Sequence, residues 1–239
     1  MKKAFFSFHG SLKDFLGSVH SDPWITCYYQ GSQSVKHLIE SLHVPHPEVG
    51  EISNNGVPID HSYIVQDGDW IEVFPFQLNG HFTQDEARFV LDNHLGKLAA
   101  YLRILGFDAD YRNDFQDDEL ALVSSQEARI LLTRDRGLLM RKIVTQGYCL
   151  RSLNPIQQLD EVVYRYHLAP IINPFQRCVH CNHQLQPVEK TEVLERLEPL
   201  TRKYFYEFHI CQACHHIYWK GSHYERLAKF ITNHYTNEE

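Results

Sequence analysis

The 239-residue sequence lacks the features of a secreted or membrane-spanning protein. No apolar run approaches the roughly 18 residues that a membrane-spanning helix needs. The basic start, MKKAFFSF, is followed by neither a long apolar run nor a small-residue cleavage site, so it is not typical of a signal peptide. Internal repeats and low-complexity tracts are also absent from the sequence. These absences predict a cytoplasmic protein with no membrane partner.

The sequence also lacks the excess of basic residues that is typical of nucleic-acid-binding proteins. The formal net charge is −7. Residues 1–78 hold 4 basic and 9 acidic side chains, residues 79–167 hold 11 and 13, and residues 168–239 hold 8 and 8. The negative charge therefore lies mainly near the N-terminus. It counts mildly against nucleic-acid binding and does not exclude it for the rest of the chain.

Residues 1–78 have the element order of a small α+β domain. Residues 34–42 carry apolar side chains at helical spacing, which predicts a helix. Ser34, at the start of this range, is a favoured N-cap residue. Strand-like runs and a turn surround this helix, at residues 3–8, 24–29, 54–56 (the turn) and 70–74. Strand, strand, helix, strand, strand is a β-grasp order, so we expect a β-grasp domain here.

Residues 79–168 alternate between strand-like and helix-like segments, which predicts an α/β fold with a parallel sheet covered by helices. The expected strands are residues 89–91, 107–111, 130–133 and 148–150. The expected helices are residues 94–105, 117–127, 137–144 and 155–168. Gly106 is placed where a glycine would end the first of these helices.

Carboxylates follow two of the expected buried strands. Asp92 follows the first strand, Asp135 follows the third, and Asp117 opens the helix between them. Because the carboxyl ends of parallel strands meet at one edge of a sheet, these side chains are candidates for one site. Mg²⁺ and similar cations prefer oxygen ligands and activate water toward phosphodiesters. The pattern therefore indicates a metal-dependent catalytic site, with Asp118 or Glu127 in a supporting role.

Each acidic residue also has a structural interpretation. Asp117 and Asp118 suit the start of a helix, and Asp135 suits the N-cap of the helix that begins at Arg136. Glu127 suits a solvated helix end. Asp92 is the least readily explained by structure alone, because it comes directly after a buried run.

Four of the six cysteines form two Cys-x-x-Cys pairs in residues 169–239, with 29 residues between the pairs. Each pair presents two thiolates to one tetrahedral ion, which predicts a structural zinc ribbon with an insertion. The ligands would be Cys178, Cys181, Cys211 and Cys214. The run from Cys211 to His215 also matches a c-type haem attachment signature, but the first pair and the absent export signal favour zinc.

Two longer runs resemble the Mut-7 C-terminal RNase family of PIN-like domains, namely LDNHLGKLAAYLRILGFDADY and DDELALVSSQEARILLTRDRGLL. The pieces SVKHLIESLHVPHPEVGEI, NNGVPID and DGDWIEVFPF resemble ubiquitin-like sulfur carriers. Carriers end in a free Gly-Gly carboxylate, whereas this chain continues through residues 76–80 into the next domain, so carrier chemistry is not expected. The resemblance spans nearly the whole chain. It implies a β-grasp domain (1–78), a PIN-like nuclease domain (79–168) and a zinc ribbon (169–239).

The resemblance implies a ribonuclease that requires Mg or Mn and has a structural Zn ion. It matches Asp92, Asp117 and Asp135 to the metal-binding acids of the family. Many relatives have a further acid where this chain has Gly137, which favours a single metal or compensation by Asp118 or Glu127. The basic positions that match phosphate contacts are Lys97, Arg103, Arg134 and Arg136.

The expected substrate is RNA, such as tRNA, rRNA or mRNA, and the β-grasp domain is expected to bind a protein partner. The aromatic residues Tyr218 and Trp219 after the last cysteine would either stack on RNA bases or pack in the ribbon core. The alternative function is a non-catalytic RNA- or ribosome-binding adaptor with a degenerate site. A third interpretation is a docking or regulatory role of the β-grasp domain in a sulfur-transfer or translation complex.

Overall fold

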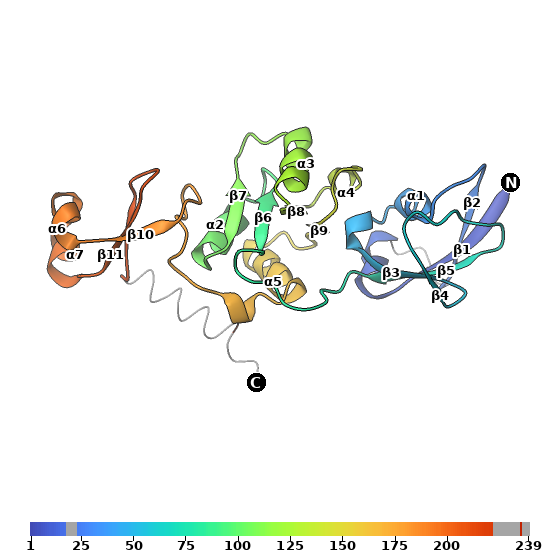
Figure 1. Ribbon diagram of the computed structural model, residues 1–239, viewed down its shortest axis with the longest axis horizontal. Coiled ribbons are helices and arrows are strands. Elements are labelled where there is room, and N and C mark those ends of the chain that lie inside the picture. The colour runs from blue at the N-terminus through green and yellow to red at the C-terminus, as the bar shows by residue number, and fades with distance from the viewer. Residues whose placement is uncertain (18–22, 222–234, 236–239) are drawn as a thin grey trace. The chain divides into compact units, whose positions relative to one another are not determined.

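The computed structural model describes residues 1–17, 23–221 and 235 (Figure 1). They form two compact units, of which the first combines residues 1–79, 90–92 and 113–151, and the second the remaining ranges. This division differs from the three predicted segments, and the boundaries 1–78, 79–168 and 169–239 stay a prediction. Within the described residues, no helix has the length and apolarity needed to cross a membrane.

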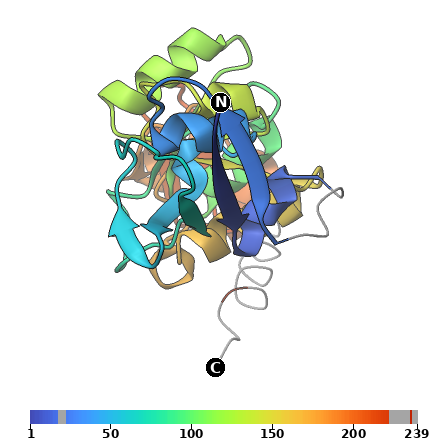
Figure 2. The same cartoon turned by 90° about the vertical axis from the view of Figure 1, so that its right-hand side faces the viewer.

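The N-terminal segment is a five-stranded sheet in the order β2-β1-β5-β3-β4 with one α-helix, which confirms the predicted β-grasp order (Figure 2). Its strands are β1 (Lys2–Phe8), β2 (Ile25–Tyr29), β3 (Val49–Asn54), β4 (Val57–Ile59) and β5 (Trp70–Pro75). The helices are α1 (Val35–Ser41) and the 3₁₀ turns η1 (Gly10–Phe15) and η2 (His46–Glu48). The side chain of Ser34 accepts a hydrogen bond from the backbone N–H of His37, so Ser34 is the N-cap as predicted.

The central sheet has four strands in the order β7-β6-β8-β9, and β8 and β9 pair in parallel. The strands are β6 (Arg88–Leu91), β7 (Asp108–Tyr111), β8 (Ile130–Thr133) and β9 (Gly147–Cys149). The helices are α2 (Gly96–Ile104), α3 (Asp117–Gln126), α4 (Arg136–Leu139) and α5 (Pro155–Arg165). The predicted α/β class is confirmed. Gly106 follows α2 with a φ of 97°, a conformation that glycine adopts without strain.

All four helices are shorter than predicted, and two of them, α4 and α5, end three or more residues early for local reasons. After α4 the hydrogen bonds change from the α-helical to the 3₁₀ pattern, since the backbone N–H of Arg141 donates to the carbonyl of Leu138, three residues earlier. The predicted helix through residue 144 therefore stops at Leu139. The helix α5 ends at Arg165 because His167 has a left-handed φ of 49°, and it begins with Asn154 as N-cap before Pro155.

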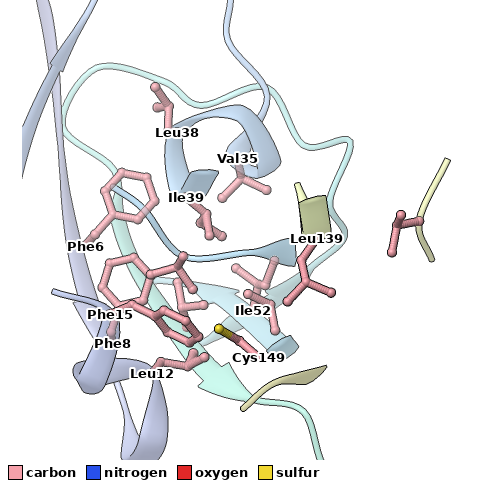
Figure 3. Close-up of a cluster of buried hydrophobic side chains, with 14 of the residues drawn as sticks. Phe6, Phe8, Leu12, Phe15, Val35, Leu38, Ile39, Ile52, Leu139 and Cys149 are labelled. Carbon is pink, nitrogen blue, oxygen red and sulfur yellow. The ribbon is translucent and has the colours of Figure 1, made fainter. Parts of the chain in front are cut away.

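The first unit has one continuous hydrophobic core that includes both β-grasp and central-sheet residues. Figure 3 shows Leu139 of α4 and Cys149 of β9 beside Ile52 of β3. The same cluster contains Phe6 and Phe15 of the β-grasp segment. The β-grasp segment therefore packs as an integral part of this unit, because burial of shared apolar surface favours one common core.

The C-terminal segment is a three-stranded antiparallel sheet with a helical insertion. Its strands are β10 (Leu185–Val188), β11 (Phe208–Cys211) and β12 (Ile217–Trp219). The insertion consists of α6 (Lys190–Val193), η4 (Leu194–Arg196) and α7 (Pro199–Tyr204), and η3 (Ala169–Ile171) precedes the ribbon. Trp219 packs against Phe205 and Phe208 in a small separate core, which supports the packing interpretation of this aromatic residue.

Candidate active site and zinc centre

Thr133 connects two of the predicted metal-binding acids. Its hydroxyl donates to Oδ2 of Asp92 at 2.6 Å and accepts from the backbone N–H of Asp135 at 2.9 Å. Asp92 is only 4% exposed, and its backbone N–H donates to the carbonyl of Leu132 on the neighbouring strand. Two strands that end side by side thus place Asp92 and Asp135 around one threonine hydroxyl.

Asp135 is also the N-cap of α4. Its Oδ1 accepts from the backbone N–H of Gly137 at 2.7 Å and more weakly from that of Leu138 at 3.4 Å. An ionised carboxylate has about four acceptor sites, so the cap leaves capacity for a cation. A Cβ added at Gly137 would lie 3.2 Å from this same oxygen, a tight contact. The capping interpretation of Asp135 is confirmed, and it is compatible with a ligand role.

Asp117 and Asp118 lie in the first turn of α3 and face an arginine that the sequence pattern did not single out. Arg141 Nη2 lies 3.7 Å from a carboxylate oxygen of Asp117, and Arg141 Nη1 donates to Asp118. The N-cap position itself belongs to Gln116, whose backbone N–H donates to Glu119. Asp117 is therefore a first-turn residue and not the cap. Its carboxylate shares the guanidinium of Arg141 with that of Asp118.

Glu127 cannot join Asp117 at one ion. The two residues lie at opposite ends of the ten-residue helix α3, which at 1.5 Å per residue separates them by about 15 Å. Glu127 also forms an ion pair with Arg129 at 2.7 Å. The expected supporting role of Glu127 is therefore not compatible with the helix geometry.

In the part of the chain that the structure describes, only the four ribbon cysteines form a compact group of three or more potential metal ligands. Asp92, Asp117 and Asp135 do not converge in this way. Sequence reasoning missed Thr133 and Arg141 as site residues. Thr133 had one usable signal, its position directly between the strand β8 and Asp135, whereas Arg141 had none.

The predicted phosphate-binding residues fall into two groups. Lys97 and Arg134 are exposed. Arg136 donates to the backbone carbonyl of Phe15 at 3.0 Å and lies 4.9 Å from the centre of its ring. Arg103 is 5% exposed and donates to the carbonyls of the residues at 109, 179 and 180. The structure thus shows a structural role for Arg103, and the phosphate contact stays a prediction.

The cysteine sulfur atoms are arranged as a zinc ligand set. Sγ of Cys178 lies 3.4 Å from Cys214, Sγ of Cys181 lies 3.3 Å from Cys211, and all four lie within 4.8 Å of one another. A tetrahedral site with Zn–S bonds of about 2.3 Å requires sulfur separations near 3.8 Å. Four thiolates at these distances complete a closed structural site, so the residues fit a zinc ion.

The environment of the cluster affects its cysteines unequally. Burial raises the pKa of the Cys181 thiol to about 12. Burial opposes ionisation of Cys178 too, but hydrogen bonds from Tyr218 and from backbone N–H groups outweigh it and lower the pKa of Cys178 to about 6. The thiols therefore titrate as a coupled group, because each one's charge affects the ionisation of its neighbours.

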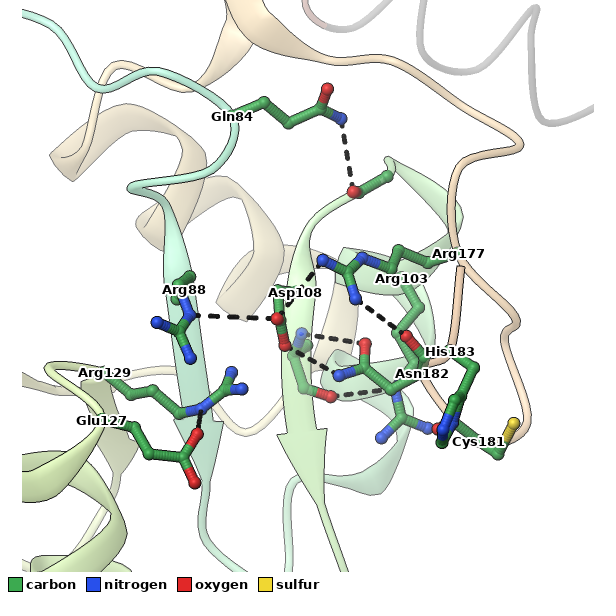
Figure 4. Close-up of polar contacts among 12 residues, drawn as sticks. Gln84, Arg88, Arg103, Asp108, Glu127, Arg129, Arg177, Cys181, Asn182 and His183 are labelled. Carbon is green, nitrogen blue, oxygen red and sulfur yellow. Dashed lines mark hydrogen bonds and ion pairs between the residues drawn. The ribbon is translucent and has the colours of Figure 1, made fainter. Parts of the chain in front are cut away.

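The first cysteine loop is anchored to α2 and β7 by polar contacts (Figure 4). Arg103 donates to the carbonyls of Val179 and His180 at 3.1 and 3.2 Å. The side chain of Asn182 accepts from the backbone N–H of Ala109 and donates to Asp108 at 2.8 Å. The first cysteine loop is therefore packed as part of the second unit.

Comparison with known proteins supplies the family. A family model described as Mut7-C RNAse domain matches residues 87–231, and one described as Mut7-C ubiquitin matches residues 1–80. A search of curated proteins finds no match. The first match covers more than half of the chain and includes Asp92, Asp135 and the four ribbon cysteines. The chain belongs to the Mut7-C RNAse domain family and has a Mut7-C ubiquitin-like domain at its N-terminus.

Proposed function

We propose that this chain is a Mg²⁺- or Mn²⁺-dependent ribonuclease that hydrolyses RNA phosphodiester bonds. The family match supports a ribonuclease-like function. The proposal adds that Asp92 and Asp135 hold the catalytic ion, and that Asp117, which does not converge with them in this structure, would join them when the ion binds, with Asp118 beside it. Their oxygen atoms are the ligand type that these hard cations prefer.

The observation that carries the proposal is the Thr133 bridge between Asp92 and Asp135. A carboxylate directly after a buried strand is costly to keep ionised unless it has a partner or a ligand. The Thr133 hydroxyl holds Asp92 in one orientation, and the α4 cap holds Asp135 in another. Two oriented carboxylates from neighbouring strand ends support the proposal, because they would offer two of the oxygen ligands that such an ion needs.

The other groups have roles that follow from their positions. A bound divalent ion would polarise the phosphate and activate a water molecule. Arg141 pairs with Asp117 and Asp118 and would turn toward the negative charge of a bound phosphate. Exposed Lys97 and Arg134 are proposed phosphate contacts; Arg136 is also exposed but already donates to one backbone carbonyl, and buried Arg103 donates to three.

The second candidate is an RNA-binding adaptor without catalysis. Gly137 replaces an expected acid, and Arg141 occupies the carboxylates of Asp117 and Asp118. An arginine at this point stabilises the acids without metal, which favours a site that has lost its chemistry. The two candidates differ in turnover and not in RNA binding.

The test is cleavage of single-stranded and structured RNAs with Mn²⁺ or Mg²⁺, with Asp92→Asn and Asp135→Asn beside the unmodified chain. The ribonuclease proposal predicts metal-dependent cutting that falls at least about 100-fold in both variants, the scale of losing one charged group that stabilises a transition state. Asp69→Asn is the matched control, because Asp69 is also a buried, hydrogen-bonded acid but lies in the β-grasp domain. RNA binding without cutting by the unmodified chain would identify the adaptor.

A further inference from the structure

The β-grasp sheet has apolar side chains on both of its faces, and among the described residues the hydrophobic core lies against one of them. Along β1 and β5 the inner positions Phe6, Ile71 and Val73 are fully buried in the core. Strand side chains alternate between faces, so Phe5 and Trp70 point to the opposite, outer face. The burial pattern of β2 follows this alternation, as do positions 70–73 of β5 and positions 3–6 of β1, whereas Ser7 on the outer side of β1 is buried.

Aromatic residues gather on the outer face. Phe5 and Trp70 are direct cross-strand partners, and their rings stack with centroids 4.3 Å apart. The ring of Trp24 meets Trp70 edge-on at 4.8 Å. On the next strand Tyr28 pairs with Lys3. We name this set the outer aromatic face: Phe5, Trp24, Tyr28 and Trp70.

The face is preorganised and open. Tyr28 is 62% exposed and Trp70 is 42% exposed. The stacking partners hold the Trp70 ring in place, so little side-chain entropy remains to be lost when a partner covers it. Tryptophan and tyrosine that are rigid and exposed on one patch are typical anchors of protein interfaces.

The net negative charge of the β-grasp domain favours a positively charged partner at this face. Residues 1–78 carry 4 basic and 9 acidic side chains, so the net charge of the domain disfavours a polyanion such as RNA, although Lys3 lies on this face with its Nζ 5.5 Å from the centre of the Phe5 ring. Glu72 also lies on the outer side of β5, two residues after Trp70. The faces of aromatic rings attract arginine and lysine, and nearby carboxylates strengthen that attraction.

We propose that the outer aromatic face is the docking site of an arginine- and lysine-rich segment of a protein partner. Trp70 and Tyr28 would stack on guanidinium or ammonium groups of that segment, and the acidic domain would steer it there. The proposal concerns the β-grasp domain alone, so it does not depend on whether the acids at 92 and 135 catalyse hydrolysis.

The experiment uses the full chain and a fluorescently labelled peptide of alternating arginine and glycine, followed by fluorescence anisotropy. An acidic peptide of equal length and a single-stranded oligouridine are the competing probes. Trp70→Ala and Tyr28→Ala are each expected to weaken binding of the basic peptide about 10-fold or more, as at interface hot spots. Tyr28→Ala serves as the second variant because Tyr28 is the more exposed of the two residues. Thermal melting verifies that both variants fold.

Tyr164→Ala is the matched control, because Tyr164 on α5 is 84% exposed and lies in the other unit. It should leave peptide binding unchanged. Peptide binding that survives both aromatic substitutions would reflect net charge alone and would overturn the proposal. Two other results would also overturn the proposal: a Trp70→Ala chain that no longer binds oligouridine, or a Trp70→Ala chain that no longer self-associates in sedimentation.

Discussion

The carboxylate of Glu48, at the end of η2 in the β-grasp segment, accepts from Nη1 of Arg151 at 2.9 Å although 103 residues separate them. Glu48 is 0% exposed, and the same oxygen accepts from the backbone N–H of Cys149 at 2.6 Å. The guanidinium of Arg151 lies 4.4 Å from the centre of the Phe15 ring. One buried acid thus ties the β-grasp segment to the end of β9.

This pair should contribute strongly to stability. Glu48→Leu removes the carboxylate and leaves Arg151 and the N–H of Cys149 without it, so we expect a loss of about 3–5 kcal/mol in the free energy of unfolding. Glu48→Gln keeps an acceptor oxygen and should cost less. Chemical denaturation of the full chain measures both. Asp14→Asn is the control, because Asp14 meets the same arginine at 3.8 Å from an exposed position. It should change the free energy of unfolding by less than about 1 kcal/mol.

The Thr133 bridge predicts a separate result. Thr133→Val keeps the side-chain shape but removes the hydroxyl that Asp92 and the Asp135 N–H use. We expect a loss of about 1–3 kcal/mol in the free energy of unfolding, because buried polar groups lose a partner. Metal-dependent RNA cleavage should fall as well. Thr133→Ser restores the hydroxyl and should recover both quantities. A Thr133→Val chain with unchanged cleavage would contradict the proposed orienting role.

Zinc should be part of the folded chain. We expect one zinc ion for each chain in metal analysis of protein purified without chelator, bound by Cys178, Cys181, Cys211 and Cys214. Strong chelators should release it and lower the melting temperature of the second unit, because the binding energy of a structural zinc ion is folding energy. Cys211→Ser should reproduce this effect. Cys27→Ser, in the β-grasp core, should leave the zinc content unchanged.

A substitution of Arg103 distinguishes the phosphate contact expected from the sequence from the structural role seen in the fold. Arg103→Lys keeps the charge but loses the planar guanidinium that reaches three carbonyls at once. We expect faster loss of zinc to a chelator in this variant, because the first cysteine loop is less well held. Lys97→Ala, on the exposed side of the same helix α2, should leave zinc release unchanged. Weaker RNA binding with unchanged zinc release in Arg103→Lys would instead favour the phosphate contact.

Cys149 predicts a pH dependence of stability. Burial raises the pKa of its thiol from 9.0 to about 11. Between pH 9 and 11 the unfolded chain therefore loses this proton before the folded chain does, and the free energy of unfolding decreases as the pH rises. Two pKa units correspond to a maximum of about 2.7 kcal/mol, which is fully present below pH 9 and lost through pH 11. Denaturation of the unmodified chain and of Cys149→Ala across this range isolates the effect. Equal slopes in both chains would contradict it.

The sequence by itself determined the order of the elements and the local signals at their ends. Ser34 as a cap, Gly106 as a helix stop and the cysteine pairs act through neighbours along the chain or through fixed spacing. These features depend on short-range geometry, so pattern reasoning reaches them. The two acids at strand ends, Asp92 and Asp135, follow from the same logic, because a buried run leads directly into each.

Only the tertiary structure decided which charged groups meet. Nothing in the local sequence distinguishes Arg103, Arg136 and Arg141 from ordinary surface arginines. In the fold they donate to carbonyls or carboxylates of segments that are distant in the sequence. Glu48 gave no signal, because its partners at 149 and 151 lie about a hundred residues away. Long polar side chains satisfy whichever buried group the packed core brings within hydrogen-bond distance. That choice is made by the packing of whole segments, and local sequence does not specify it.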